Sequence, residues 1–109
     1  MPRQKIAVIR VTKTGITPTA EIDGDPANGH VLANTGRTVL LVRNADTADP
    51  HTLTLVTPGT VDGQPIGDRA IAIPAGATRW IGGIDPAIYS SALQVDVDSA
   101  QLKILALEP

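Results

Sequence analysis

The stretch Asp-Arg-Ala-Ile-Ala-Ile-Pro-Ala-Gly-Ala-Thr-Arg-Trp-Ile-Gly-Gly, residues 68–83, decides the fold class of this chain. Large isoleucines alternate with small alanines before Pro74, and a second alternating run follows Gly76. A period of two residues is typical of β-strands. Pro74 ends the first strand because it has no N–H to donate, and Gly76 supplies the positive φ that a tight reversal needs. The stretch therefore predicts strand, turn and strand, arranged as a hairpin.

The second strand of this stretch contains Trp80, the single Trp of the chain. Because Ala70 and Ala72 leave room for a large ring opposite them, we expect Trp80 to be the main ring of the core. On that interpretation Trp80→Ala costs roughly 3–5 kcal/mol of stability. The alternative places Trp80 in an interface, where Trp is enriched. The further interface candidates are Arg79, Lys5 and Arg3.

Alternating segments separated by Gly, Pro and Asn recur along the whole chain. We expect strands at 5–12, 18–23, 30–33, 38–44, 51–57, 69–73, 78–82, 93–98 and 101–107. Turns spaced roughly 8–12 residues apart are typical of sandwiches and barrels. The predicted fold is all-β, a single-domain antiparallel β-sandwich or jelly-roll-like fold of about eight strands. This domain spans residues 1–109, with 1–4 and 108–109 as flexible tails.

Three segments depart from this regular alternation. Asp85 followed by Pro86 favours a helix start, and predicts at most one short helical turn near 86–90. The segment 38–44 is apolar on both faces at its middle, which predicts a central strand or one covered by a neighbouring subunit. The Gly/Pro-rich loop 57–68 is the least constrained region.

The composition limits the classes of function. Nine basic and eleven acidic side chains are scattered along the chain, and the absence of a basic run counts against nucleic-acid binding. No apolar run approaches the ~20 residues of a membrane span. With one Trp, one Tyr and no Phe, the chain lacks the stacking platforms of glycan and single-strand binders, and its core must be aliphatic. It has no Cys for disulfides or thiolate metal sites.

No motif predicts catalysis. Ser90, Ser91, His30 and His51 could supply a nucleophile and a base, but no Gly-x-Ser-x-Gly elbow surrounds the serines, which we interpret as loop or cap residues. Carboxylates that could hold a hard cation are Glu21, Asp23 and Asp25, then Asp96 and Asp98, then Asp46 and Asp49 with His51. The EF-hand pattern is absent. We predict no catalytic residue, no metal and no cofactor, with calcium binding by an acidic cluster left open.

Four segments carry a family pattern: Asn-Thr-Gly-Arg-Thr-Val-Leu-Leu-Val-Arg-Asn (34–44), Thr-Leu-Thr-Leu-Val-Thr-Pro-Gly-Thr-Val-Asp-Gly (52–63), Ile-Pro-Ala-Gly-Ala-Thr-Arg-Trp-Ile-Gly (73–82) and Pro-Ala-Ile-Tyr (86–89). In this order they resemble small virion proteins of tailed bacteriophages and prophages. The resemblance covers about residues 30–107. The chain departs from the pattern where Gly83-Ile84 replaces the usual second Pro near Gly82.

The resemblance implies a β-sandwich or jelly roll with a non-enzymatic function, most simply a capsid decoration (cement) protein or another minor head protein. Such a protein is in the host cytoplasm during assembly and on the capsid surface of the virion afterwards. The implied partners are the major capsid protein and further copies of the chain, as a homo-oligomer with a trimer favoured, and neither nucleic acid nor membrane. Segments 1–4 or 57–68 would be the elements that dock on the capsid shell. The alternatives are a head–tail joining or tail-tube subunit and a host-surface or glycan-binding module.

Overall fold

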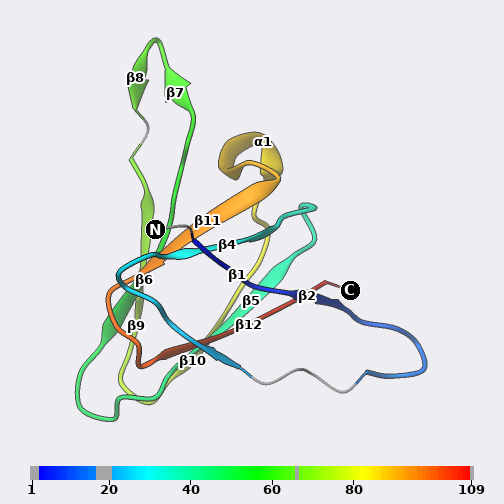
Figure 1. Cartoon of the computed structure of the whole chain (residues 1–109), viewed down its shortest axis with the longest axis vertical. Coiled ribbons are helices and arrows are strands. Elements are labelled where there is room, and N and C mark those ends of the chain that lie inside the picture. The colour runs from blue at the N-terminus through cyan, green and yellow to red at the C-terminus, as the bar shows by residue number, and fades with distance from the viewer. Residues whose placement is uncertain (1–2, 17–20, 66, 109) are drawn as a thin grey trace.

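The chain folds into a β-sandwich of two five-stranded sheets (Figure 1), as the computed structural model shows for the residues it describes, 3–16, 21–65 and 67–108. The first sheet has the order β1 (Gln4–Lys5), β4 (His30–Ala33), β11 (Ala92–Val97), β6 (His51–Leu55) and β9 (Arg69–Ile73). The second has the order β10 (Thr78–Ile81), β5 (Val39–Asn44), β12 (Leu102–Glu108) and β2 (Val8–Arg10), and β3 (Ile22–Asp23) also pairs with β12. The all-β sandwich predicted from the alternation is confirmed.

The expected strand at 5–12 is two short strands that belong to different sheets. β1 pairs with β4 and β2 pairs with β12, and both pairings are parallel. Ile6, between the two strands, is buried in the core. Both sheets are therefore mixed, and the expectation of a purely antiparallel sandwich fails at this segment. The reason is that the chain changes sheets here, so it enters each sheet without a hairpin.

Residues 68–83 also cross between the sheets, which corrects the expected hairpin. β9 pairs with β6 and β10 pairs with β5, so the two strands do not pair with each other. The reversal itself is as expected, because Gly76 has a φ of +70° and the Ala77 N–H donates to the Pro74 carbonyl at 3.0 Å. The Pro74–Ala77 turn is thus an arch that joins the last strand of one sheet to the last strand of the other.

The remaining boundaries lie close to the expected ones. The single helix among the described residues is α1 (Pro86–Tyr89), and the Asp85 carboxylate caps it by accepting the Ala87 N–H at 2.8 Å. Loop 57–68 contains a small hairpin, β7 (Thr60–Val61) and β8 (Gln64–Pro65), which Figure 1 shows projecting from the sandwich. Gln4 and Glu108 lie in strands, whereas residues 1–2 and 109 of the expected tails and 17–20 are outside the described residues.

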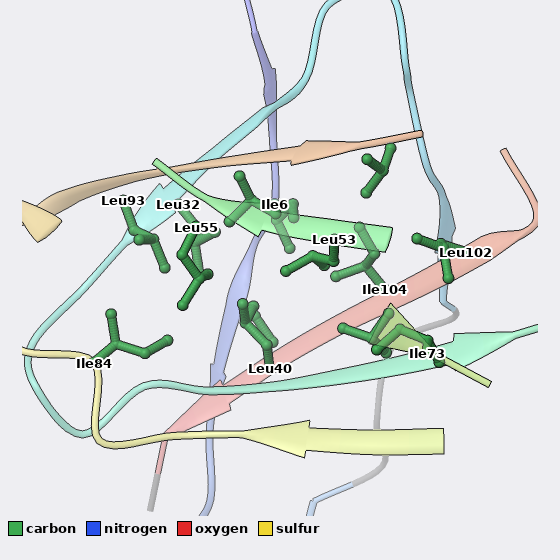
Figure 2. Close-up of a cluster of buried hydrophobic side chains, with 14 residues drawn as sticks. Ile6, Leu32, Leu40, Leu53, Leu55, Ile73, Ile84, Leu93, Leu102 and Ile104 are labelled. Carbon is green, nitrogen blue, oxygen red and sulfur yellow. The ribbon is translucent and has the colours of Figure 1, made fainter. Parts of the chain in front are cut away.

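Branched aliphatic side chains fill the space between the sheets (Figure 2). Leu53, Ile73 and Leu93 of the first sheet face Leu40 and Ile104 of the second, and all five are fully buried. The described core residues are Ile6, Leu32, Leu40, Val42, Leu53, Leu55, Ile73, Ile84, Leu93, Val95, Val97, Leu102, Ile104 and Ala106. Because no aromatic ring is among these residues, the core depends on the interlocking of branched chains.

One buried amide ties the arch to the second sheet. Asn44, at the end of β5, is only 1% exposed, and its Nδ2 donates to the carbonyls of Asp49 at 3.0 Å and Ile73 at 3.1 Å. Its Oδ1 accepts the Asp46 N–H at 3.0 Å, and its backbone N–H donates to the Ala77 carbonyl at 2.9 Å. Through its side chain and its backbone N–H, Asn44 thus holds the loop after β5, the end of β9 and the arch in place.

We predict that Asn44→Ala lowers the free energy of unfolding by about 2–4 kcal/mol, because it leaves several buried backbone groups without a partner. Asn34→Ala is the matched control. Asn34 is also buried, but its Nδ2 reaches one carbonyl, that of Ser90 at 3.2 Å, so its loss should cost about 1–2 kcal/mol. Denaturant unfolding of the two variants checks this ranking, and equal losses would contradict the role given to Asn44.

Candidate interaction surface

Trp80 lies on the outer face of the second sheet and is 74% exposed. It stands opposite Leu41, whereas its neighbour Ile81 stands opposite Leu40, which is buried in the core. The expectation that Trp80 is the main core ring is therefore wrong. The physical reason is the arch, because the alanines of β9 belong to the other sheet and make no space for a ring on β10.

Apolar side chains dominate the outer face around Trp80. The strand registers place Trp80, Leu41 and Leu105 in one row across the sheet. They place Val39, Leu107 and Ile9 in the next row. We call these six residues the apolar face: Ile9, Val39, Leu41, Trp80, Leu105 and Leu107. All of them except Trp80 are half-buried, so each of the five keeps part of its side chain in contact with solvent.

The outer face of the first sheet has a different character. Thr54 of β6 stands opposite Asp96 of β11, and the Thr52 N–H donates to the carboxylate of Asp98, which follows β11. Ala70 and Ala72 of β9 are exposed on the same face. The two sheets therefore differ in what they present to solvent: the first presents mainly Thr, Ala and Asp around β6, whereas the second presents large aliphatic side chains and Trp80. The double apolar pattern at 38–44 was the sequence signal for this, since β5 is central and its outward residues are also apolar.

Two ion pairs border the apolar face. The Arg43 guanidinium donates to both oxygens of Glu21 at 3.0–3.2 Å, and the Lys103 ammonium contacts Asp23 at 2.8 Å. Arg43 and Lys103 stand opposite each other in the row next to Trp80. The hydrogen bonds and charge of Glu21 raise the pKa of Arg43 above its ordinary value. Each cation has its own carboxylate, so this end of the face presents balanced charge.

The acidic clusters suggested by the sequence are engaged in local contacts. Glu21 and Asp23 hold Arg43 and Lys103, while the Asp25 carboxylate accepts the backbone N–H groups of residues 27 and 28, both at 3.1 Å. Hydrogen bonds from Asn28, first of all from its side chain, lower the pKa of Asp25. Among the residues that the structure describes, no group of three or more His, Cys, Asp or Glu is placed to hold a metal ion.

His51 lies between two carboxylates. His51 Nε2 is 3.0 Å from Asp46 Oδ2, and its Nδ1 is 3.5 Å from Asp98 Oδ1. The backbone N–H of Ala48 and then the His51 ring lower the pKa of Asp46. The Ser90 hydroxyl accepts the Ala92 N–H at 3.2 Å. Among the described residues, neither His30 nor His51 contacts a serine hydroxyl, so these side chains do not form a pair of nucleophile and general base.

The four interface candidates from the sequence fall on opposite sides of the sandwich. Trp80 and Arg79 are neighbours on β10, whereas Lys5 belongs to β1 and Arg3 precedes it, at the far edge of the first sheet. Arg3 already has an internal role, because its Nη1 lies 2.6 Å from Asp96 Oδ1 and also contacts the carbonyls of His30 and Val95. Of the four, Trp80 and Arg79 share one strand, but they point to opposite faces of it, because Trp80 stands opposite Leu41 and Arg79 opposite the buried Val42.

A cavity of about 250 Å³ lies where the chain crosses between the sheets near Ile6. Ile22, Ile104 and Ala106 line it, and Lys5 is the one charged residue among the described residues of its lining. Ligand sites combine an apolar pocket with several convergent polar groups. The cavity offers a single amine without a partner acid or base, so its chemistry does not resemble that of a hydrolytic site.

His30 is fully buried at the end of β4 that faces the loop at 24–29. Its Nε2 accepts the Asp25 backbone N–H at 2.9 Å, which leaves the proton of the neutral ring on Nδ1, an atom with no hydrogen-bond partner. Gly29 lets the chain pass close by, since a Cβ there would meet the Arg3 guanidinium and the Asp96 carboxylate. Burial, the strongest influence, lowers the pKa of His30 below its ordinary value of 6.5.

We predict that the protein loses stability as the pH falls below about 6.5, by up to about 1.4 kcal/mol per pH unit. The unfolded chain protonates His30 near 6.5, whereas the folded chain resists the proton, so acid favours unfolding until the lower folded pKa is reached. His30→Gln should flatten this dependence between pH 7.5 and 5 in denaturant titrations, with His51→Gln as the control. Protonation of Asp25 and Asp46 acts only below about pH 4. A slope that survives in His30→Gln would contradict the assignment.

The exposure of Trp80 leads to a third prediction about stability. Trp80→Ala should change the free energy of unfolding of the monomer by less than about 1 kcal/mol, as exposed substitutions usually do. Leu53→Ala, at a fully buried position, should cost about 2–5 kcal/mol. Thermal or denaturant unfolding at low protein concentration measures both. A loss at Trp80 as large as that at Leu53 would return Trp80 to a structural role.

Comparisons with models of known protein families, with curated proteins and with solved structures found no significant match. The described residues include no helix with the length and apolar character needed to cross a membrane. The features of the chain that bear on function are the apolar face, which includes Trp80, and the segments at 34–44, 52–63, 73–82 and 86–89.

Proposed function

We propose that this chain is a non-enzymatic structural protein of a bacteriophage head, a capsid decoration (cement) protein that self-associates and stabilises the shell. The observation that carries the proposal is the exposure of Trp80 at the margin of the apolar face, on a body whose core is already closed. Large exposed apolar side chains are typical of surfaces that a partner buries. The resemblance of segments 34–44, 52–63, 73–82 and 86–89 to small virion proteins supplies the class of partner.

A cement protein stabilises a shell by burying surface against neighbouring subunits. The apolar face would be buried against another copy or against the major capsid protein, at about 25 cal/mol per Å² of apolar area removed from water. A close-packed sandwich has low compressibility, so it would keep its shape when neighbouring subunits bind its surface. The β7–β8 hairpin, which projects from the body (Figure 1), is the element that would reach a second surface. The protein would then occupy the outside of the capsid in the virion.

We predict that the purified protein co-sediments with phage heads that lack it. Trp80→Lys should reduce the bound amount by at least about tenfold, because the variant places a charge where an aromatic ring is desolvated. Thr54→Lys, on the polar outer face of the first sheet, is the matched control and should bind like the unchanged protein. The measurement is the fraction of protein in the head pellet as its concentration is varied.

Three outcomes would contradict the proposal. Protein that stays in the supernatant at every concentration would exclude a role on the shell. Electron micrographs that show the protein as a ring at the neck or along the tail would instead support a head–tail joining or tail-tube subunit. A Thr54→Lys variant that binds as poorly as Trp80→Lys would show that the apolar face is not the surface involved.

A further inference from the structure

The edge strand β10 has an open side. It pairs with β5 alone, so among the described residues its other edge has no strand partner. An open strand edge presents unpaired N–H and C=O groups and is a template for another strand. Proteins usually protect such edges with charge, Pro or a bulge. The single charged residue of β10 is Arg79, and the strand contains no Pro.

The backbone of β10 shows which groups face this open side. The Asn44 N–H donates to the Ala77 carbonyl, so Ala77 and then Arg79 and Ile81 direct their polar groups toward β5. Thr78 and Trp80 direct theirs away. Gly82 follows the last residue of β10, and extending the β5–β10 register by one residue would place it opposite Val39. A Cβ on Gly82 would lie 3.6 Å from Val39, which fits a continuation of the alternation.

We propose that two copies of this chain associate by antiparallel pairing of their β10 strands around a two-fold axis at Trp80. The inference rests on the proposed function and names the surface that joins the copies. In this register Trp80 stands opposite Trp80 of the second copy, and Thr78 stands opposite Gly82. All three outward-facing residues then exchange N–H···O=C bonds across the junction, and a shift of the pairing by two residues leaves some of them unpaired.

Charge and side-chain packing favour the same register. A two-fold axis at Arg79 would place two like charges directly opposite each other, which is unfavourable, whereas an axis at Trp80 places Arg79 opposite Ile81. The two Trp80 rings then lie side by side on the outer face, each next to its own Leu41. Aromatic pairs directly across two strands are among the more stabilising cross-strand pairs.

The other strand edges fit less well. The Asp98 N–H donates to the Thr52 carbonyl, so Thr52 of β6 directs its backbone polar groups toward β11. Ala72 stands opposite Thr52, so Ala72 and likewise Ala70 direct their backbone polar groups toward the open side of β9. These alanines have no ring to bury. β1 and β2 are only two and three residues long. β10 is therefore the edge on which pairing removes the most apolar surface from water.

The size of the contact sets the expected affinity. A stable dimer buries about 800 Å² per partner, and a Trp side chain contributes about 150–250 Å². A four-residue strand with one Trp falls short of a permanent interface. We therefore expect a reversible dimer with a dissociation constant on the order of micromolar.

The first experiment tests the backbone pairing by sedimentation velocity. The unchanged protein should move from the mass of one chain to that of two as its concentration rises. Thr78→Pro should weaken this association at least about tenfold, because it removes an outward N–H without breaking a bond to β5. Thr78→Ala, which keeps the N–H, and Ala72→Pro, on the β9 edge, are the matched controls and should dimerise normally. Circular dichroism checks that each variant is folded.

The second experiment tests the register. The chain has no Cys, so one introduced Cys can form only an intermolecular disulfide. Residues directly opposite in antiparallel strands have Cα atoms about 4.5–5.5 Å apart, within the span that a disulfide accepts. Trp80→Cys should therefore cross-link on oxidation at high concentration. Thr78→Cys, on the same strand and face, should not cross-link, because this register places residue 78 opposite Gly82 of the second copy and not opposite residue 78.

The outcomes separate this inference from the proposed function. A trimer or other oligomer that is insensitive to Thr78→Pro would overturn the β10 pairing and leave the decoration role standing. Cross-linking at 78 instead of 80, or equal effects of Thr78→Pro and Ala72→Pro, would also overturn it. A protein that is monomeric at all concentrations yet co-sediments with heads would contradict only the pairing. Failure to co-sediment would contradict the proposed function.

Discussion

The buried amide of Asn44 is the interaction on which the rest of the structure depends. The chain changes sheets at the Pro74–Ala77 arch, and a change of sheet leaves backbone groups that no ladder satisfies. Asn44 donates to the carbonyls of Asp49 and Ile73 and accepts from the Asp46 N–H. The Gly76 N–H adds a bond to the Asp46 carbonyl at 2.9 Å. One polar side chain at the end of a central strand thus allows the core to close over an irregular turn.

The arch in turn determines which strand edges stay open. A hairpin would have paired β9 with β10 and covered one edge of each, whereas an arch makes each the last strand of its sheet. At the opposite side the chain crosses again near Ile6, and there the short strands β1 and β2 fill both edges. The two sides of the sandwich are consequently unequal. One is closed by very short strands, and the other exposes the full length of β9 and β10.

Most of the fold could be predicted from the sequence because period-two patterns and turn residues act locally. Gly76 and Asp85 took the turn and cap roles that their chemistry favours. The pairing of strands could not be predicted, because whether 69–73 and 78–82 pair with each other or with strands of two sheets depends on contacts distant in sequence. The misplacement of Trp80 followed from that single error. The apolar face could be predicted in part, because segment 38–44 is apolar on both faces whereas a central strand of a sandwich requires apolar residues only on its inner side.

Folding alone does not explain the residue at position 80. The position lies on an exposed edge strand, where Thr or Lys would satisfy the backbone equally well and would protect the edge from unwanted pairing. The charge of Arg79 gives little protection, because its position in the register is opposite Val42, on the side of the sheet that faces the core. Trp80 is exposed on an unprotected strand edge and continues the row of Leu41 and Leu105. This arrangement makes the monomer prone to association. Such a surface is consistent with a chain whose working state includes a partner against β10.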